Sequence, residues 1–180
     1  LPYVEAVTSS LENSPLWGYS GELMFDEGGK SLFSTKYDYA DEDYAKMMGI
    51  NIKQGRFPRE RREVSANETW LKTRGWSVDH AIGQTIQTEE GKVKIVGIIK
   101  DFHIGNFFNE NQPFLMHYNP TFNGMIHLRL KEPFAENLQR LNKEAGEAFP
   151  GQTINFEGLE QALADSYNSV RVFRNATIAA

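Results

Sequence analysis

The chain contains no cysteine among its 180 residues. This absence excludes disulfide bridges, thiol nucleophiles and thiolate metal sites within this sequence. It does not indicate a cellular compartment, because a protein without cysteine is compatible with oxidising and reducing surroundings alike.

The chain also lacks any apolar run of about 20 residues, the length that a membrane-spanning helix needs. It has no initiator methionine and no signal peptide. It begins abruptly at Leu1-Pro2 and stops within a predicted helix at residues 177–180. We therefore expect that it is a piece of a longer protein, and that part of the function resides outside this piece.

The sequence also lacks an excess of positive charge and the common motifs of hydrolases and nucleotide-binding proteins, which reduces the number of functions to consider. The net charge is −5, whereas a nucleic-acid-binding protein usually presents a basic face. The most basic stretch, residues 56–62, is interleaved with Glu60 and followed by Glu63, which predicts a solvated loop with ion pairs. The sequence has no GxSxG or SxxK motif of a hydrolase, and no glycine-rich loop that could hold a phosphate.

What is present favours one α+β fold. Hydrophobic residues make up 40% of the chain and charged residues 24%, which is typical of a folded globular protein. Short segments with the hydrophobic spacing of helices and others with the alternation of strands, separated by Gly and Pro, indicate helices mixed with strands. We expect strands or extended segments at 3–8, 20–26, 31–40, 50–55, 63–66, 84–88, 92–100, 114–118, 125–131 and 153–157, and helices at 41–49, 68–74, 79–82, 134–149 and from 159 onward.

Local signals refine three of these elements. Asp41 and Asn67 are placed to cap the helices that follow them, and Gly75 is suited to the end of the second. The segment 92–100 is apolar on both faces, so we expect a central, covered strand. Gly97 within it predicts a bulge or a close approach of another backbone.

Few residues suggest catalysis. Asp101, His103, His117 and His127 could converge on a metal ion in a metal-assisted enzyme, although no two of them have tight ligand spacing. Local hydrogen bonding is the favoured reading. Residues 67–69 match the N-glycosylation pattern, which capping by Asn67 explains equally well. Arg56 is expected to form a structural ion pair rather than to bind a ligand.

The segment 107–122 is rich in aromatic side chains and in loop-forming residues. Most of these rings are expected in the core, and an exposed subset would form a surface for a partner or an apolar ligand. The candidates for that surface are Phe107, Phe108 and Phe122. If the segment bound an apolar ligand, the chain would instead be a stand-alone periplasmic ligand-binding protein with an enclosed pocket.

Five short motifs, in order along the chain, carry a resemblance to a known family. They are YVEAVTSS at 3–10, DYAKMMGINIKQGRF at 43–57, VSANETWLKTRGW at 64–76 with AIGQTI at 81–86, VKIVGIIKDFH at 93–103, and the proline at 113. Together they resemble the extracytoplasmic domain of MacB-like and FtsX-like ABC-transporter permeases, in the versions common in Bacteroidetes-type bacteria.

The resemblance implies a porter-like α+β subdomain, formed by residues 1–40 and 114–180, with a smaller mixed α/β subdomain inserted at 41–113. It implies that both ends of the domain lie close together and lead into membrane helices. The loop after Phe57 and the segment after His103 depart from the family pattern, and such loops usually set the choice of partner.

The resemblance also implies a role without catalysis. Such domains lie on the periplasmic side of the inner membrane and move as a pair when ATP is hydrolysed in the cytoplasm. The implied partners are a second permease copy, a cytoplasmic ATPase, and a periplasmic adaptor with an outer-membrane channel. No cofactor is expected in this domain, since ATP would bind a separate nucleotide-binding domain or subunit, and the family offers no catalytic or metal-binding residue here.

Overall fold

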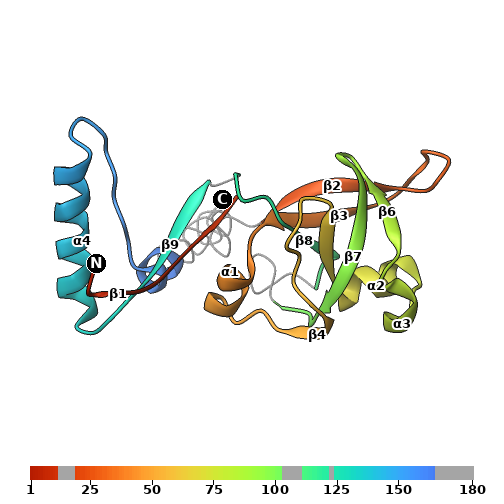
Figure 1. Ribbon diagram of the computed structural model, residues 1–180, viewed down its shortest axis with the longest axis horizontal. Coiled ribbons are helices and arrows are strands. Elements are labelled where there is room, and N and C mark those ends of the chain that lie inside the picture. The colour runs from red at the N-terminus through yellow and green to blue at the C-terminus, as the bar shows by residue number, and fades with distance from the viewer. Residues whose placement is uncertain (12–18, 103–110, 122–123, 165–180) are drawn as a thin grey trace, which may run out of the picture. The chain divides into compact units, whose positions relative to one another are not determined.

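The computed structural model describes residues 1–11, 19–102, 111–121 and 124–164, which contain helices and a mixed sheet (Figure 1). The α+β class expected from the sequence is confirmed. Contacts divide the chain into two compact units. Residues Leu1–Ala6 and Leu128–Ala180 form the smaller unit, and Val7–His127 form the larger unit.

The larger unit is built on a seven-stranded mixed sheet (Figure 1). The strands run in the order β4, β7, β5, β8, β3, β2, β6, and β6 pairs with β7 as well as with β2, so the sheet closes on itself. Pairs β5–β7 and β3–β8 are parallel and the others antiparallel. The bounds are β2 Ser20–Phe25, β3 Ser31–Tyr39, β4 Ile52–Gly55, β5 Glu63–Asn67, β6 Thr85–Thr88, β7 Gly91–Ile99 and β8 Phe114–His117.

Two apolar clusters lie on opposite faces of this sheet. Alternation along a strand divides them, since Leu115 belongs to one cluster and its neighbours Phe114 and Met116 to the other. Helix α2 (Glu68–Arg74) contributes Trp70 to the first cluster, which α3 (Val78–Ala81) extends. Helix α1 (Glu42–Met47) contributes Tyr44 to the second. Strand β8 is buried along its whole length because both of its faces are covered.

Strand β7 is central and covered, as expected, and its glycine has the predicted role. Val64 of β5 pairs with Ile95, but the next residue of β5 pairs with Gly97, so β7 carries one extra residue between them. A Cβ on Gly97 would lie 2.0 Å from the carbonyl oxygen of Arg56. Only glycine permits this approach, which lets the backbone N–H of Arg56 donate to the oxygen of Val96 at 3.1 Å.

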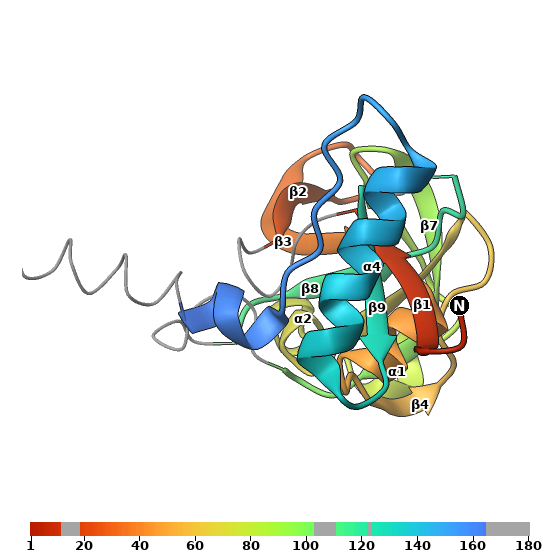
Figure 2. The same cartoon turned by 90° about the vertical axis from the view of Figure 1, so that its left-hand side faces the viewer.

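The remaining strands and the last described helices involve both ends of the chain. Strands β1 (Val4–Ser10) and β9 (Met125–Leu130) form a two-stranded sheet, followed by α4 (Phe134–Ala148) (Figure 2). In the smaller unit, the hydroxyl of Tyr3 donates to Glu144 of α4 at 2.7 Å, and the guanidinium of Arg140 lies over the Tyr3 ring. These contacts attach the start of the chain to α4.

The prediction of a strand at residues 153–157 is wrong, because the structure has no strand there. Instead, the side-chain amide of Asn142 on α4 accepts from the backbone N–H of Phe156 at 2.6 Å and donates to its carbonyl at 2.9 Å. A helix side chain thus satisfies the groups that a neighbouring strand would have paired. Residues 159–164 are helical, and the rest of the helix expected there lies outside the described residues.

The apolar face predicted for α4 is buried only in part. Leu141 is buried, but Phe134 and Phe149 at the two ends of the helix are 41% and 51% exposed. Within the described part of the chain, no helix combines the length and the apolar character that crossing a bilayer requires.

The observed units do not share the boundaries expected from the family resemblance. Strands β2, β3 and β8 fall in the expected porter-like part, yet they pair in one sheet with β4 to β7 of the expected insert. Contacts instead separate Val7–His127 from the two ends of the chain. The division into 1–40 plus 114–180 and 41–113 stays a prediction.

The close backbone approach at Gly97 predicts a sharp cost for any side chain there. Gly97→Ala should lower the free energy of unfolding by about 2–3 kcal/mol, because the new methyl group collides with a backbone that cannot rotate away. Urea denaturation followed by tryptophan fluorescence measures this change. Gly146→Ala is the matched control: it lies in α4 with no atom near its Cβ position, so it should be neutral or slightly stabilising. Equal stability of Gly97→Ala and wild type would contradict the bulge.

Candidate functional site

The three residues expected to form a partner surface, Phe107, Phe108 and Phe122, lie outside the described residues. Other apolar residues of the same segment are core. Phe114 and Met116 are fully buried in the cluster that faces α1, and the Phe114 ring makes edge contacts with Tyr19 and Phe102. The described apolar residues of the segment 107–122 are therefore packed into the core and do not form the wall of an apolar cavity.

The four residues considered for a metal site do not come together where they are described. His117 Nε2 lies 2.8 Å from Glu22 Oε1, His127 Nε2 lies 2.8 Å from Ser10 Oγ, and the Asp101 carboxylate accepts from Thr69. His103 lies outside the described residues. Among the described residues, no three His, Asp or Glu side chains are placed to hold one metal ion.

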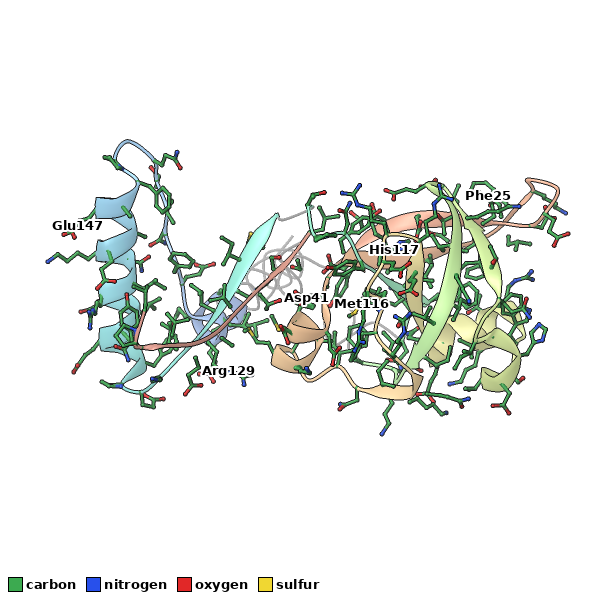
Figure 3. The ribbon with its side chains drawn as sticks, in the orientation of Figure 1. Phe25, Asp41, Met116, His117, Arg129 and Glu147 are labelled. Atoms are coloured by element: carbon green, nitrogen blue, oxygen red, sulfur yellow. The ribbon has the colours of Figure 1, made fainter. Side chains whose placement is uncertain are left out.

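His117, which Figure 3 labels, belongs instead to a buried polar cluster inside the larger unit. Both His117 and its partner Glu22 are almost completely buried. The rings of Tyr37 and Tyr39 pack against the imidazole at 5.7 and 5.2 Å. The Tyr39 hydroxyl donates to Glu90, and burial, followed by this hydrogen bond, raises the pKa of Tyr39. The cluster ties β2, β3 and β8 to the β6–β7 turn.

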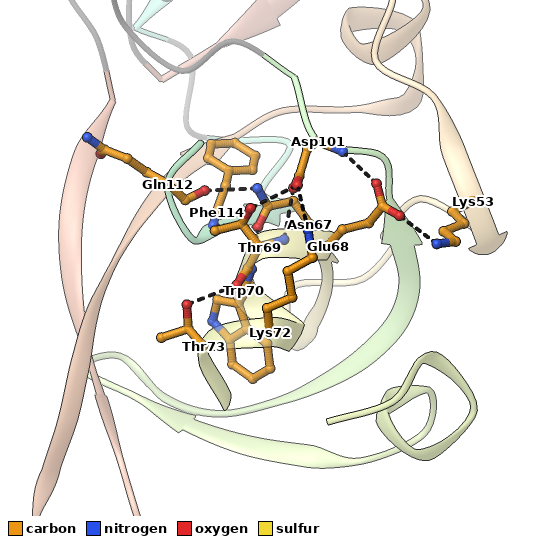
Figure 4. A network of polar contacts seen from close by, with 10 residues as sticks. All are labelled: Lys53, Asn67, Glu68, Thr69, Trp70, Lys72, Thr73, Asp101, Gln112 and Phe114. Carbon is orange, nitrogen blue, oxygen red and sulfur yellow. Dashed lines mark hydrogen bonds and ion pairs between the residues drawn. The ribbon is translucent and has the colours of Figure 1, made fainter. Parts of the chain in front are cut away.

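A highly connected polar site lies where β5 leads into α2 (Figure 4). We call it the Asn67 network: Asn67, Glu68, Thr69, Asp101, Gln112 and Phe114. Asn67 is completely buried, and its Oδ1 accepts from the backbone N–H groups of Trp70 and Phe114, both at 2.9 Å. Its Nδ2 donates to the carbonyl of Gln112 at 2.9 Å. One side chain thus caps α2 and also fixes the start of β8.

Asp101 holds the other side of the same helix end. Its carboxylate accepts from the backbone N–H and from the hydroxyl of Thr69, each at 2.8 Å. The backbone N–H of Asp101 in turn donates to Glu68, which also pairs with Lys53 of β4. The Lys53 contact, with that backbone N–H, lowers the pKa of Glu68. A carboxylate beside exposed N–H groups of a helix start is electrostatically favoured.

The consequence is that the chain on both sides of residues 103–110 is fixed at one place. Asp101 and Phe102 precede that segment, and Gln112 follows it closely. Asp101 and Gln112 both bond to the start of α2, while Phe102 packs on Phe114 with ring centroids 5.1 Å apart. The described residues on both sides of this segment are therefore joined to the start of α2 and to β8.

A second anchor joins β4 to β5, as the sequence led us to expect for Arg56. Its guanidinium forms a two-point ion pair with Glu63, whose carboxylate also accepts from the backbone N–H of Arg59 at 3.0 Å. Arg56 is the main cause that lowers the pKa of Glu63 to about 2. The Ser65 hydroxyl donates to the Arg56 carbonyl, so the pair also fixes the backbone beside Gly97.

Comparison with known proteins bears on the fold. No family model matches the sequence, and no curated protein matches it. Three solved structures are similar. A domain of a permease protein from Porphyromonas gingivalis has TM-score 0.52 and 18% identity, over 91% of this chain and 81% of that one. The periplasmic region of MacB from Actinobacillus actinomycetemcomitans has TM-score 0.54 and 15% identity, over 97% and 78%.

The third is the extracellular domain of the noncanonical ABC-type transporter YknZ from Gram-positive bacteria, with TM-score 0.52 and 10% identity over 79% of this chain and 77% of that one. The chain has the fold of a MacB-like periplasmic domain. The resemblance drawn from the five sequence motifs is thereby confirmed at the level of fold.

Within this MacB-like fold, sequence reasoning found half of the Asn67 network. The cap formed by Asn67 was expected and is confirmed, and its burial leaves no room for a glycan on the folded domain. The bonds from Asn67 to Gln112 and Phe114, and from Asp101 to Thr69, were missed. They join residues 32 to 47 positions apart in sequence, and only the pairing of β5 with β7 and β8 brings them together.

Removal of the Asn67 side chain should destabilise the larger unit strongly. Asn67→Ala leaves the buried N–H groups of Trp70 and Phe114 without their acceptor, so we expect a loss of about 2–4 kcal/mol in the free energy of unfolding. Ser77→Ala is the matched control, because it removes the cap of α3 alone and should cost about 0.5–1 kcal/mol. Urea denaturation of both variants measures the difference, and similar costs would contradict the double role of Asn67.

Proposed function

We propose that this chain is the extracytoplasmic domain of an ABC-transporter permease. The observation that carries the proposal is the fold likeness across 79–97% of the chain to three solved domains, of which one is named as part of a permease, one as part of an ABC-type transporter and one as the periplasmic region of MacB. Two of those names specify an extracellular or periplasmic location. In this proposal the domain lies on the periplasmic side of the inner membrane, between membrane helices that adjoin it in the complete protein.

The proposed role is mechanical and non-catalytic. The domain couples ATP-driven conformational change in the cytoplasm to substrate export or to a periplasmic partner. ATP binds a separate nucleotide-binding domain or subunit, in keeping with the lack of a phosphate-binding loop in this sequence. The remaining proposed partners are a second permease copy and, on the periplasmic side, an adaptor with an outer-membrane channel.

The Asn67 network supports such a role physically. Transmission of displacement requires that a contact segment be joined to a stiff body rather than to a flexible linker. Residues on both sides of 103–110 are bonded to α2 and to buried strands, so the segment that carries Phe107 and Phe108 is joined to the sheet at both ends. Phe107, Phe108 and Phe122 remain the proposed contact surface.

Labelling of one introduced cysteine tests both location and coupling. Lys143→Cys on α4 replaces a side chain that is 77% exposed, and this chain has no other cysteine. In the complete permease, freed of cysteines elsewhere, this position should react with a membrane-impermeant maleimide in intact cells with a permeabilised outer membrane. Spin labels there should report a distance between two copies that shifts by several ångströms when ATP is trapped at the ATPase.

The isolated 180-residue chain with the same label is the control, and ATP should leave its spectrum unchanged. Reaction only after the inner membrane is disrupted would contradict the proposed location. Reaction from outside together with an ATP-independent distance would contradict the proposed coupling while leaving the location intact.

A further inference from the structure

Three elements meet at His127 of β9. Its imidazole Nε2 lies 2.8 Å from Oγ of Ser10 on β1, and its ring packs against the ring of Tyr44 on α1, with the centroids 5.2 Å apart. Ser10 and Tyr44 are almost completely buried, and the Tyr44 hydroxyl is hydrogen-bonded to Ser10 as well as to Tyr19. One half-buried imidazole thus joins β1 and β9 to a helix that packs on the main sheet.

The backbone around this contact is closely fitted. The N–H of Gly124, which precedes β9, donates to the carbonyl of Ser10 at 3.0 Å. A Cβ on Gly124 would lie 2.0 Å from the carbonyl oxygen of Leu11. Ser10 also forms an isolated bridge with Ala40, the residue before the cap of α1. The Gly124 amide therefore reports whether β1 and the start of β9 are held together at this place.

Burial, and not a neighbouring charge, controls the protonation of His127. Of the carboxylates that the structure describes, none pairs with the ring, and burial lowers the pKa of His127 below its ordinary value of 6.5. A proton added to the ring here would cost the imidazole its hydration as a cation without supplying an anion in exchange. The closed contact is therefore built for the neutral ring.

The other titratable groups near this contact have partners of their own. They are Tyr19, Asp38 of β3, Asp41 before α1, Tyr44 and, two residues further along β9, Arg129. Asp41, which Figure 3 labels, accepts from the hydroxyl of Thr8 and the N–H of Tyr44, both at 2.8 Å, and Asp38 accepts from the N–H of Leu11 at 3.1 Å. Ion pairs also join the charged side chains of α1: Glu42, Asp43 and Lys46.

Acid should weaken the contact at His127. When β9 opens from β1, the ring meets water and takes up a proton with its ordinary pKa, whereas the closed contact resists protonation. The contact is therefore fully stable above about pH 6.5 and loses stability as the pH falls below that value. The opening equilibrium rises by at most about ten-fold for each pH unit, until the lowered pKa of the closed state is reached. Burial, followed by the nearby Tyr19 and Asp38, raises the pKa of Tyr44, so its hydroxyl stays neutral throughout this range.

We propose that Ser10, Tyr44 and His127 form an acid-sensitive latch, which holds β1 and β9 to α1 at neutral pH and releases them when the imidazole is protonated. All three residues belong to the larger unit, whose boundaries fall within β1, between residues 6 and 7, and within β9, between residues 127 and 128. The latch therefore acts beside the two points where the chain enters and leaves that unit. The inference stands whether or not the chain belongs to a transporter.

Hydrogen exchange of the Gly124 amide tests the latch on the 180-residue chain. After correction for the intrinsic exchange rate, the opening equilibrium at this amide should rise about three- to ten-fold between pH 7.5 and pH 5.5, ten-fold being the limit for one group with an open-state pKa of about 6.5. His127→Gln keeps an uncharged side chain that can bond to Ser10, and it should remove this rise. His80→Gln is the matched control, because His80 is an exposed histidine of α3, and it should leave the rise unchanged.

A second measurement follows the ring itself. In NMR titrations of the wild-type chain, the His127 imidazole, identified by its loss in His127→Gln, should titrate at a lower pH than it does when the chain is unfolded in urea.

The proposal fails if the corrected exchange of Gly124 is the same at the two pH values. It also fails if His127→Gln keeps the rise, which would assign the effect to another group, such as His117 beside Glu22. A His127 ring that titrates at or above the pH found for the unfolded chain would contradict it as well.

Discussion

The side chain of Asn67 is the contact on which the rest of the larger unit most depends. One buried amide caps α2, orients the first residue of β8 and holds the residue before Pro113. Because the side chain is buried, water cannot replace a lost hydrogen-bond partner, so the loss of any of these bonds lowers the stability of the fold. Asp101 and Glu68 extend the same contact to the end of β7 and to β4. Helix and sheet are therefore joined through polar groups at one corner and through apolar packing elsewhere.

Closure of the sheet gives this corner a rigid support. Strand β7 pairs with β5 along one side and with β6 and then β4 along the other, so three neighbours restrain it. The extra residue before Gly97 lies where β7 begins to pair with β4, and the Arg56–Glu63 pair holds the chain that leaves β4. The seam between β2 and β6 is the exception, because a single residue pair joins the two strands in the described part of the chain, and a groove lined by Phe25, Trp70 and Ile86 lies beside it.

Local patterns were sufficient to predict most of the elements and several individual roles. Asp41 and Asn67 as caps, Gly75 at the end of a helix, Gly97 at a bulge and Arg56 in an ion pair all depend on a few neighbouring residues. The strand expected at 153–157 failed because Asn142, which lies on a helix, satisfies the backbone of Phe156. The closed sheet, the bonds of Asn67 to residues 112 and 114, and the groove beside Trp70 depend on strand order, which periodicity does not contain. The described histidine candidates form local hydrogen bonds with Glu22 and Ser10 rather than a metal site, since side-chain chemistry alone does not indicate burial or neighbours.

Hydrogen exchange at three amides tests the central claim most directly. The amides of Thr69, Trp70 and Phe114 donate to Asp101 and Asn67 side chains rather than to backbone groups of a regular ladder. If the Asn67 network joins helix and sheet as one body, these amides exchange with the same free energy as the buried amides of β7, through opening of the whole unit. If the amides of Thr69 and Phe114 exchanged through local opening, with a free energy of opening several kcal/mol below that of the β7 amides, the network would not join helix and sheet. That result would contradict the account.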